Sequence, residues 1–130
     1  MDNQTIEYIC GILRRGSTTW KGRVECLNRH RRQRQVGFKV GGEPKYLWEH
    51  PCEICWKWFD QKDNLLQVDH IDEVGPYKGD LHKFAGRIYC DTSNLQCLCM
   101  ECHARKTSLY NASLRFERKV SRKRERLDAF

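Results

Sequence analysis

The spacing of apolar residues predicts helices at both ends of the chain. They recur at helical spacing over residues 5–14, and Gly16 then ends the predicted helix. A second helix is predicted directly afterwards, with Trp20, Val24 and Leu27 on one face. From residue 104 to the end there is no Gly or Pro, and a partial apolar stripe predicts a long helix there.

The middle of the chain has strand character instead. Residues 46–48 and 65–71 predict strands, and in the second Val68 and His70 alternate with polar neighbours. Residues 94–98 predict a strand that returns beside it. Residues 37–44 and 75–91 contain Gly and Pro and predict a loop and a long polar connection. The fold class expected is therefore α+β.

Charge divides the chain further. The net charge of +7 over 130 residues is concentrated at the two ends, while residues 43–91 hold most of the acids. Such a distribution favours nucleic acid as the partner, although a solvated basic surface is the alternative. We expect a basic N-terminal helical arm at 1–44, a core at 45–108 and a basic C-terminal helix at 109–130.

Two features bear on the compartment. The first residues lack the basic and apolar pattern of a secretory leader, and no apolar run approaches the ~20 residues that span a bilayer. We therefore expect a cytoplasmic protein with no membrane partner. In a reducing cytoplasm, closely paired cysteines are metal ligands more often than disulfides.

Four of the eight cysteines form two closely spaced pairs, or knuckles: Cys52 with Cys55 and Cys99 with Cys102. Two residues between thiolates let one turn present both to a single ion, and two such turns complete a tetrahedral site. The pairs predict a structural Zn²⁺, with disulfides or buried thiols as alternatives. Cys97, two residues before Cys99, is the competing ligand.

Polar residues between and beside these pairs carry a second pattern. Asp69, His70 and Ile71 follow the first pair, and residues 94–107 read NLQCLCMECHARKT. In order and spacing this resembles the HNH endonucleases, and the upstream stretch is similar to the small HNH proteins of tailed bacteriophages. The resemblance implies a ββα-metal core in which a strand hairpin packs on one helix.

Roles for individual residues follow from the resemblance. It implies that Asp69 and His103 bind a catalytic divalent ion and that His70 is the general base. Asn94 ties the connecting loop and orients His70, while the structural zinc is held by Cys52, Cys55, Cys99 and Cys102. An oxygen and nitrogen site accepts Mg²⁺ or Mn²⁺, and also Ni²⁺ or Zn²⁺. Because adjacent strand residues face opposite ways, the resemblance also implies a local distortion at Asp69 and His70.

The basic residues complete the predicted function, a metal-dependent endonuclease that hydrolyses DNA. Phosphate contacts are predicted for Arg14, Arg15, Arg31, Arg32, Arg105 and Lys106. A non-catalytic, zinc-dependent DNA-binding or adaptor module is the alternative, because knuckles and basic arms suit both. A protein partner, such as a phage packaging or host enzyme, is a third option that no motif indicates.

Overall fold

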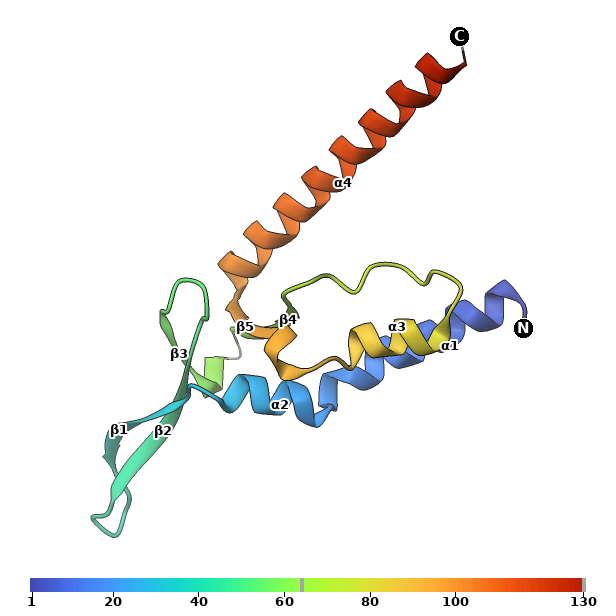
Figure 1. Cartoon of the computed structure of the whole chain (residues 1–130). Coiled ribbons are helices and arrows are strands. Elements are labelled where there is room, and N and C mark those ends of the chain that lie inside the picture. The colour runs from blue at the N-terminus through green and yellow to red at the C-terminus, as the bar shows by residue number, and fades with distance from the viewer. Residues whose placement is uncertain (64, 130) are drawn as a thin grey trace.

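The computed structural model describes residues 1–63 and 65–129. Its helices are α1 (Asn3–Gly16), α2 (Lys21–Asn28), α3 (Leu81–Ile88) and α4 (Met100–Asp128), with short 3₁₀ turns at Ser17–Thr19, Gln61–Asp63 and Thr92–Asn94. Its strands are β1 (Arg32–Phe38), β2 (Pro44–Pro51), β3 (Trp58–Asp60), β4 (Leu66–His70) and β5 (Leu95–Cys99). The N-terminal helices lie beside α3, and both the β1–β2 hairpin and α4 project from the body (Figure 1).

The centre of the molecule is a ββα unit. Strands β4 and β5 pair antiparallel, with Leu66 opposite Cys99 and His70 opposite Leu95. Helix α4 begins directly after β5, where the Cys99 thiolate caps it by accepting from the Cys102 backbone N–H at 3.5 Å. Leu95 and Leu98 of β5 are fully buried, each in a different apolar cluster. The α+β prediction with a ββα core, N-terminal helices and a long C-terminal helix is confirmed.

A second, three-stranded sheet has the order β1-β2-β3. Residues 32–38 were expected within a helical arm, and that expectation is wrong because they form β1 and pair with β2 across the proposed boundary at residue 44. The sequence RQRQVGF lacks an apolar stripe for helix packing, while Arg32 and Arg34 gain partners on the neighbouring strands. Cross-strand ion pairs of this kind stabilise a sheet.

Helix α3 lies in a stretch that was predicted to be a polar connection, so that prediction is wrong for residues 81–88. Asp80 caps the helix by accepting from the Lys83 backbone N–H at 3.1 Å. Phe84 and Ile88, four residues apart, are both buried and pack against α1 residues. Leu81 and Ala85 complete an apolar face at helical spacing, so the period is present in the sequence but confined to eight residues after Gly79.

The predicted N-terminal helices are confirmed, and aromatic contacts join them to α3. The rings of Trp20 and Tyr89 meet edge to face at 5.3 Å, and the Tyr89 hydroxyl donates to the Leu13 carbonyl. Gly22 permits this packing, because a Cβ there would lie 2.5 Å from the Trp20 ring. The pairing brings α2 against β4 and β5.

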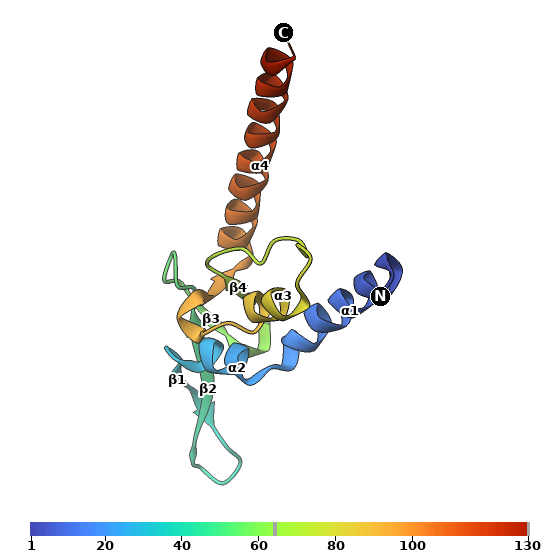
Figure 2. The same ribbon diagram turned by 45° about the vertical axis from the view of Figure 1, so that its right-hand side comes forward.

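Helix α4 leaves the body after its first turns, and its far end stands free in both ribbon views (Figures 1 and 2). Residues 121–129 are all exposed. Among residues 1–63 and 65–129, no helix combines the length and the apolar character needed to cross a bilayer.

Candidate active site and metal centre

The two cysteine pairs meet in space. The thiol sulfurs of Cys52, Cys55, Cys99 and Cys102 all lie within 4.8 Å of one another. Tetrahedral coordination with bonds of about 2.3 Å places sulfurs roughly 3.8 Å apart, and the Cys55 and Cys99 sulfurs are 3.9 Å apart. Four cysteines are therefore positioned to hold one metal ion, as their spacing predicted.

The surroundings of the thiols separate ligands from packed cysteines. Burial raises the pKa of Cys52, but hydrogen bonds from the backbone N–H groups of Cys55, Cys99 and Ile54 outweigh it and lower the pKa to about 6, which favours thiolate. Burial raises the pKa of Cys97 to about 12, but it does the same for Cys102, so position rather than acidity separates this competitor from the four ligands. Cys97 packs with Cys26 and Leu95 in a separate apolar cluster.

A second polar cluster lies where β4 faces α4. The two carboxylate oxygens of Asp69 have different neighbours: Oδ1 is 3.8 Å from His103 Nε2, while Oδ2 accepts from Lys106 Nζ at 2.6 Å. His103 and Lys106 are three residues apart on α4 and so project from one face of it. Oδ1 thus points toward the imidazole, and Oδ2 is held by the ammonium.

Lys106 joins this cluster to the loop after β4. Its ammonium also donates to the His70 carbonyl and, at 3.0 Å, to Glu73 Oε1. Burial lowers the pKa of Lys106, but hydrogen bonds to Asp69 and Glu73 outweigh it and the pKa is raised. Lys106 is therefore a fixed cation that offsets part of the negative charge of Asp69 and Glu73.

His70 is buried, with only 7% of its surface exposed. Its Nε2 lies 2.8 Å from the Ile88 carbonyl oxygen. Because a carbonyl oxygen only accepts, Nε2 carries the proton, and in the neutral ring the lone pair is on Nδ1. The last turn of α3, which the sequence did not predict, thus fixes the tautomer of His70.

Asn94 ties together the two chain segments that flank the hairpin. Its side-chain oxygen accepts from the Asp72 backbone N–H at 3.0 Å, and its carbonyl accepts from the Ile71 N–H at 2.8 Å. These bonds fix the chain immediately after His70. The side chain touches the loop rather than the imidazole.

Asp69 and His70 face opposite sides of β4, as regular strand alternation requires. The pairing of β4 with β5 runs from Leu66 to His70 without a register shift, so the distortion implied by the resemblance is not seen in it. The two side chains nevertheless line one cleft of about 520 Å³, because β4 ends there. The end of the strand, not a bulge, brings them together.

Arginines from the N-terminal helices form another wall of this cleft. Arg14 donates to the Gly75 carbonyl at 2.9 Å, and Arg23 donates through Nη1 to the Val68 carbonyl at 2.8 Å. Within the described part of the chain, Nε of Arg23 is buried without a hydrogen-bond partner. Arg23 was not among the predicted site residues, and no local signal sets it apart, since only the packing of α2 on β4 brings it to the cleft.

The remaining basic residues predicted to bind phosphate lie outside the cleft. Arg15 is exposed on α1, and Arg105 pairs with Glu101 on the surface of α4 at 3.3 Å. Arg31 stacks on Trp48, while Arg32 stacks on Trp58 and pairs with Glu49 at 3.3 Å. Arg32 therefore already has a carboxylate partner within the fold.

A comparison with known proteins finds a family match over part of this site. The family model described as HNH endonuclease matches residues 52–109, from the first knuckle through the start of α4. This segment of the chain is therefore similar to HNH endonuclease domains. No curated protein and no solved structure gives a significant match to the chain. The matched segment includes the four cysteines, β4, β5 and the cluster around Asp69, whereas α1, α2, β1, β2 and most of α4 lie outside it.

Proposed function

We propose that the chain is a metal-dependent endonuclease that hydrolyses DNA phosphodiester bonds with His70 as general base. The observation that carries the proposal is the cleft that Asp69 and His70 share, with His103 Nε2 beside the free Asp69 oxygen at 3.8 Å. HNH domains are a family of nucleases, and the net charge of +7 suits a polyanionic substrate.

The donor atoms fit two different ions. Two ligands about 2.1 Å from one ion lie at most about 4.2 Å apart, so Asp69 Oδ1 and His103 Nε2 fit a shared divalent cation, with Mg²⁺ or Mn²⁺ preferred. Bound there, the ion would polarise the phosphoryl group and stabilise the leaving oxygen. The four thiolates, a closed shell, suit a structural Zn²⁺.

His70 supplies the base in this proposal. With Nε2–H directed to the Ile88 carbonyl, the free Nδ1 is the atom that would accept a proton from water. Asn94 fixes the following backbone and thereby holds the end of β4 in place. Asn94 is a positioning residue rather than a proton carrier.

The basic residues divide into two groups. Arg14 and Arg23 line the cleft and would contact the phosphates next to the cleaved bond. Arg15, Arg31 and Arg105 are exposed and would add salt-dependent contacts further along the duplex. Lys106 and Arg32 act mainly within the fold, through the carboxylates of Asp69 and Glu49.

The test is conversion of supercoiled plasmid to nicked or linear DNA with Mg²⁺ or Mn²⁺. We expect His70→Ala to lower the cleavage rate by about 10²- to 10⁴-fold, the usual contribution of a general base. His82→Ala is the matched control, because His82 is exposed on α3, and it should cleave at the parental rate. Equal rates for the parent and His70→Ala would remove His70 from the mechanism.

One observation favours the second candidate, a zinc-dependent DNA-binding module without catalysis. Lys106 already pairs with both Asp69 and Glu73 and offsets part of their negative charge, which reduces the demand of these carboxylates for an ion. This candidate predicts that the parental protein shifts duplex DNA in gels but leaves plasmid intact with Mg²⁺, Mn²⁺, Ni²⁺ or Zn²⁺.

A further inference from the structure

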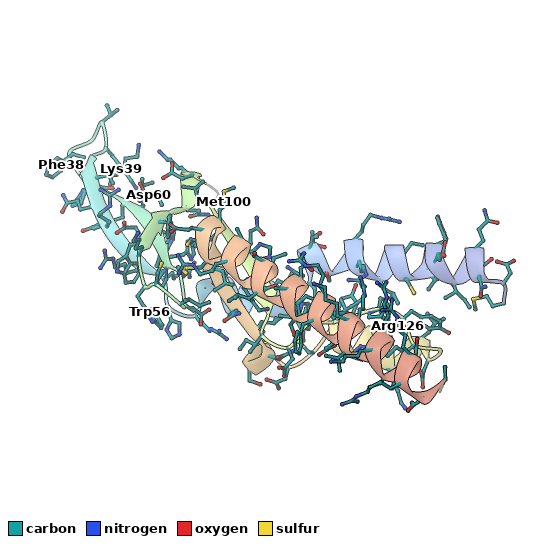
Figure 3. The ribbon with its side chains drawn as sticks, turned by 90° about the horizontal axis from the view of Figure 1, so that it is seen from above. Phe38, Lys39, Trp56, Asp60, Met100 and Arg126 are labelled. Atoms are coloured by element: carbon teal, nitrogen blue, oxygen red, sulfur yellow. The ribbon has the colours of Figure 1, made fainter. Side chains whose placement is uncertain are left out.

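The β1–β2 hairpin extends well beyond the body of the molecule (Figures 1 and 2). Strand β3 pairs only with residues Glu49, His50 and Pro51, so the outer part of the hairpin is a free two-stranded ribbon. We call residues 31–48 the ribbon. The labels of Phe38 and Lys39 mark its far end in Figure 3.

One face of the ribbon, here the charged face, satisfies its charges internally. Opposed residues of an antiparallel pair project from the same side, which puts Arg32 and Arg34 with Leu47 and Glu49. Arg34 contacts Asp60 at 3.0 Å and Glu49 at 3.4 Å, and Arg32 pairs with Glu49. These cations are occupied, so the charged face is a structural one.

The opposite face, here the amide face, has a different composition. Alternation places Gln33 and Gln35 opposite Trp48 and Tyr46. The register shift between Gln35 and Gly37 then turns Phe38 to this side. Among the described residues of the ribbon, the amide face carries no carboxylate. At the base of the ribbon Arg31 stacks on Trp48, with 3.8 Å between its Cζ and the ring centre.

Exposure shows that the protein itself leaves the amide face uncovered. Gln33 and Gln35 are exposed, and Phe38 and Tyr46 expose 69% and 50% of their surfaces. Exposed aromatic groups beside free amides indicate a contact surface. Nearby charges favour an anionic partner, because Arg31, Lys39 and Lys45 outnumber Glu43, the only acid among residues 31–45.

We propose that the ribbon enters the major groove of duplex DNA with its amide face toward the bases. A two-stranded β-ribbon fits that groove, and glutamine side chains pair bidentately with adenine there, while apolar groups contact the thymine methyl. Gln33 and Gln35 are about 6.8 Å apart along the strand, which equals about two base-pair steps of 3.4 Å. The inference rests on DNA as the substrate of the proposed function.

The inference gives the chain a base preference that the HNH domain does not carry. β1 and β2 lie outside the matched residues 52–109, and the ribbon stands apart from β4 and α3, which border the cleft (Figure 1). The preferred bases, adenine and thymine, therefore lie at a distance from the cleaved phosphate.

The test is a binding selection of the full-length protein on a random-sequence duplex library, followed by mapping of cleavage positions. We expect the parental protein to enrich an A·T-containing motif. The double variant Gln33→Ala/Gln35→Ala should lower the preference by about 5- to 150-fold for each glutamine removed, while retaining binding to random DNA. Gln4→Ala/Gln61→Ala, an exposed pair outside the ribbon, is the matched control and should keep the motif.

The remaining outcomes separate this inference from the proposed function. No motif with the parent, or the same motif with the ribbon variant, overturns base reading by the ribbon. A parental dimer that the ribbon variant abolishes, seen by sedimentation, also overturns it, because the face would then pair with a second copy. Motif selection without cleavage leaves the ribbon inference standing and refutes hydrolysis.

Phe38→Ala/Tyr46→Ala provides a second variant on the amide face. It should weaken the thymine part of the motif and leave the adenine part, since it removes apolar contacts only. Circular dichroism checks that both variants keep the parental fold. An unchanged thymine preference in this variant contradicts the placement of the amide face in the groove.

Discussion

Helix α4 is continuous, but its first half packs against the body of the protein and its second half does not. In the first half, Cys102 joins the four-thiol cluster, Lys106 pairs with Asp69, and Tyr110 lines the cleft. In the second half, residues 121–129 are all exposed and basic side chains prevail. In Figure 3 this half, where Arg126 is labelled, extends away from the start of α4, where Met100 is labelled.

The difference shows how a helix is anchored at one end only. Cys99 is the N-cap of α4 and Cys102 lies in its first turn. A metal ion bound by the four cysteines would therefore order the segment that carries His103. The far half contributes charge, and its helical state depends on propensity and ion pairs. Substitutions in the near half should therefore change folding and chemistry, and those in the far half only DNA binding.

The largest effect on stability and cleavage is expected from removing one of the four cysteine ligands. Structural zinc contributes roughly 10–16 kcal/mol in small zinc domains, or about 3 kcal/mol for each of four ligands. Cys55→Ser removes an exposed ligand and should lower the free energy of unfolding by about that amount and abolish cleavage. Thermal melting by circular dichroism measures it, with zinc content determined on the same samples.

The control for the knuckle is Cys10→Ala, since Cys10 lies in a different cluster. It should retain one zinc per chain and lose little stability. A chelator should lower the melting temperature of the parent and of Cys10→Ala, and that of Cys55→Ser by a smaller amount. Equal melting of the parent with and without the chelator would show that the four thiols hold no structural ion.

A smaller effect is expected from Lys106, which fixes the carboxylate of Asp69 through Oδ2. Outer partners of metal ligands usually change metal affinity by about 10- to 100-fold. Lys106→Met keeps the length of the side chain but frees Asp69 to rotate, so we expect weaker Mn²⁺ binding in that range. Calorimetric titration of Mn²⁺ measures this independently of cleavage.

Arg105→Met is the matched control, because its neighbour Glu101 is exposed and outside the cleft. It should bind Mn²⁺ as the parent does. Tighter Mn²⁺ binding by Lys106→Met would reverse the assignment, because the ammonium would then compete with the ion rather than orient its ligand.

These contrasts explain what the sequence could predict. The cysteine pairs are local in spacing and specific in chemistry, and two of them sufficed to predict the cluster. The predicted site roles depended on the order of the whole motif, because each residue alone has ordinary structural uses. These residues are Asp69, His70, Asn94 and His103. Their roles stay predictions, although the structure brings Asp69, His103 and the cleft together.

The failures share a physical cause. Strand β1 has no apolar face of its own and is stabilised by partners such as Glu49 and Asp60, which are distant in sequence. Helix α3 spans only eight residues within a polar stretch, so its short apolar period was overlooked, yet it supplies the carbonyl that sets the tautomer of His70. Arg23 reaches the cleft only through tertiary packing, which no pattern in its own helix encodes.

The smallest effect is expected from the far half of α4. Replacing Arg122, Lys123, Arg124 and Arg126 with glutamine should leave melting and the cleavage rate at saturating DNA near parental values, because these side chains are exposed. If they bind phosphates, the slope of log affinity against log salt falls by about 0.9 for each phosphate that the variant no longer neutralises. Glu117→Gln/Glu125→Gln, with the opposite change in charge on the same half, should not reduce that slope. An unchanged slope in the fourfold variant would mean that the far half of α4 stands clear of the duplex, and that the DNA is held by the rest of the protein.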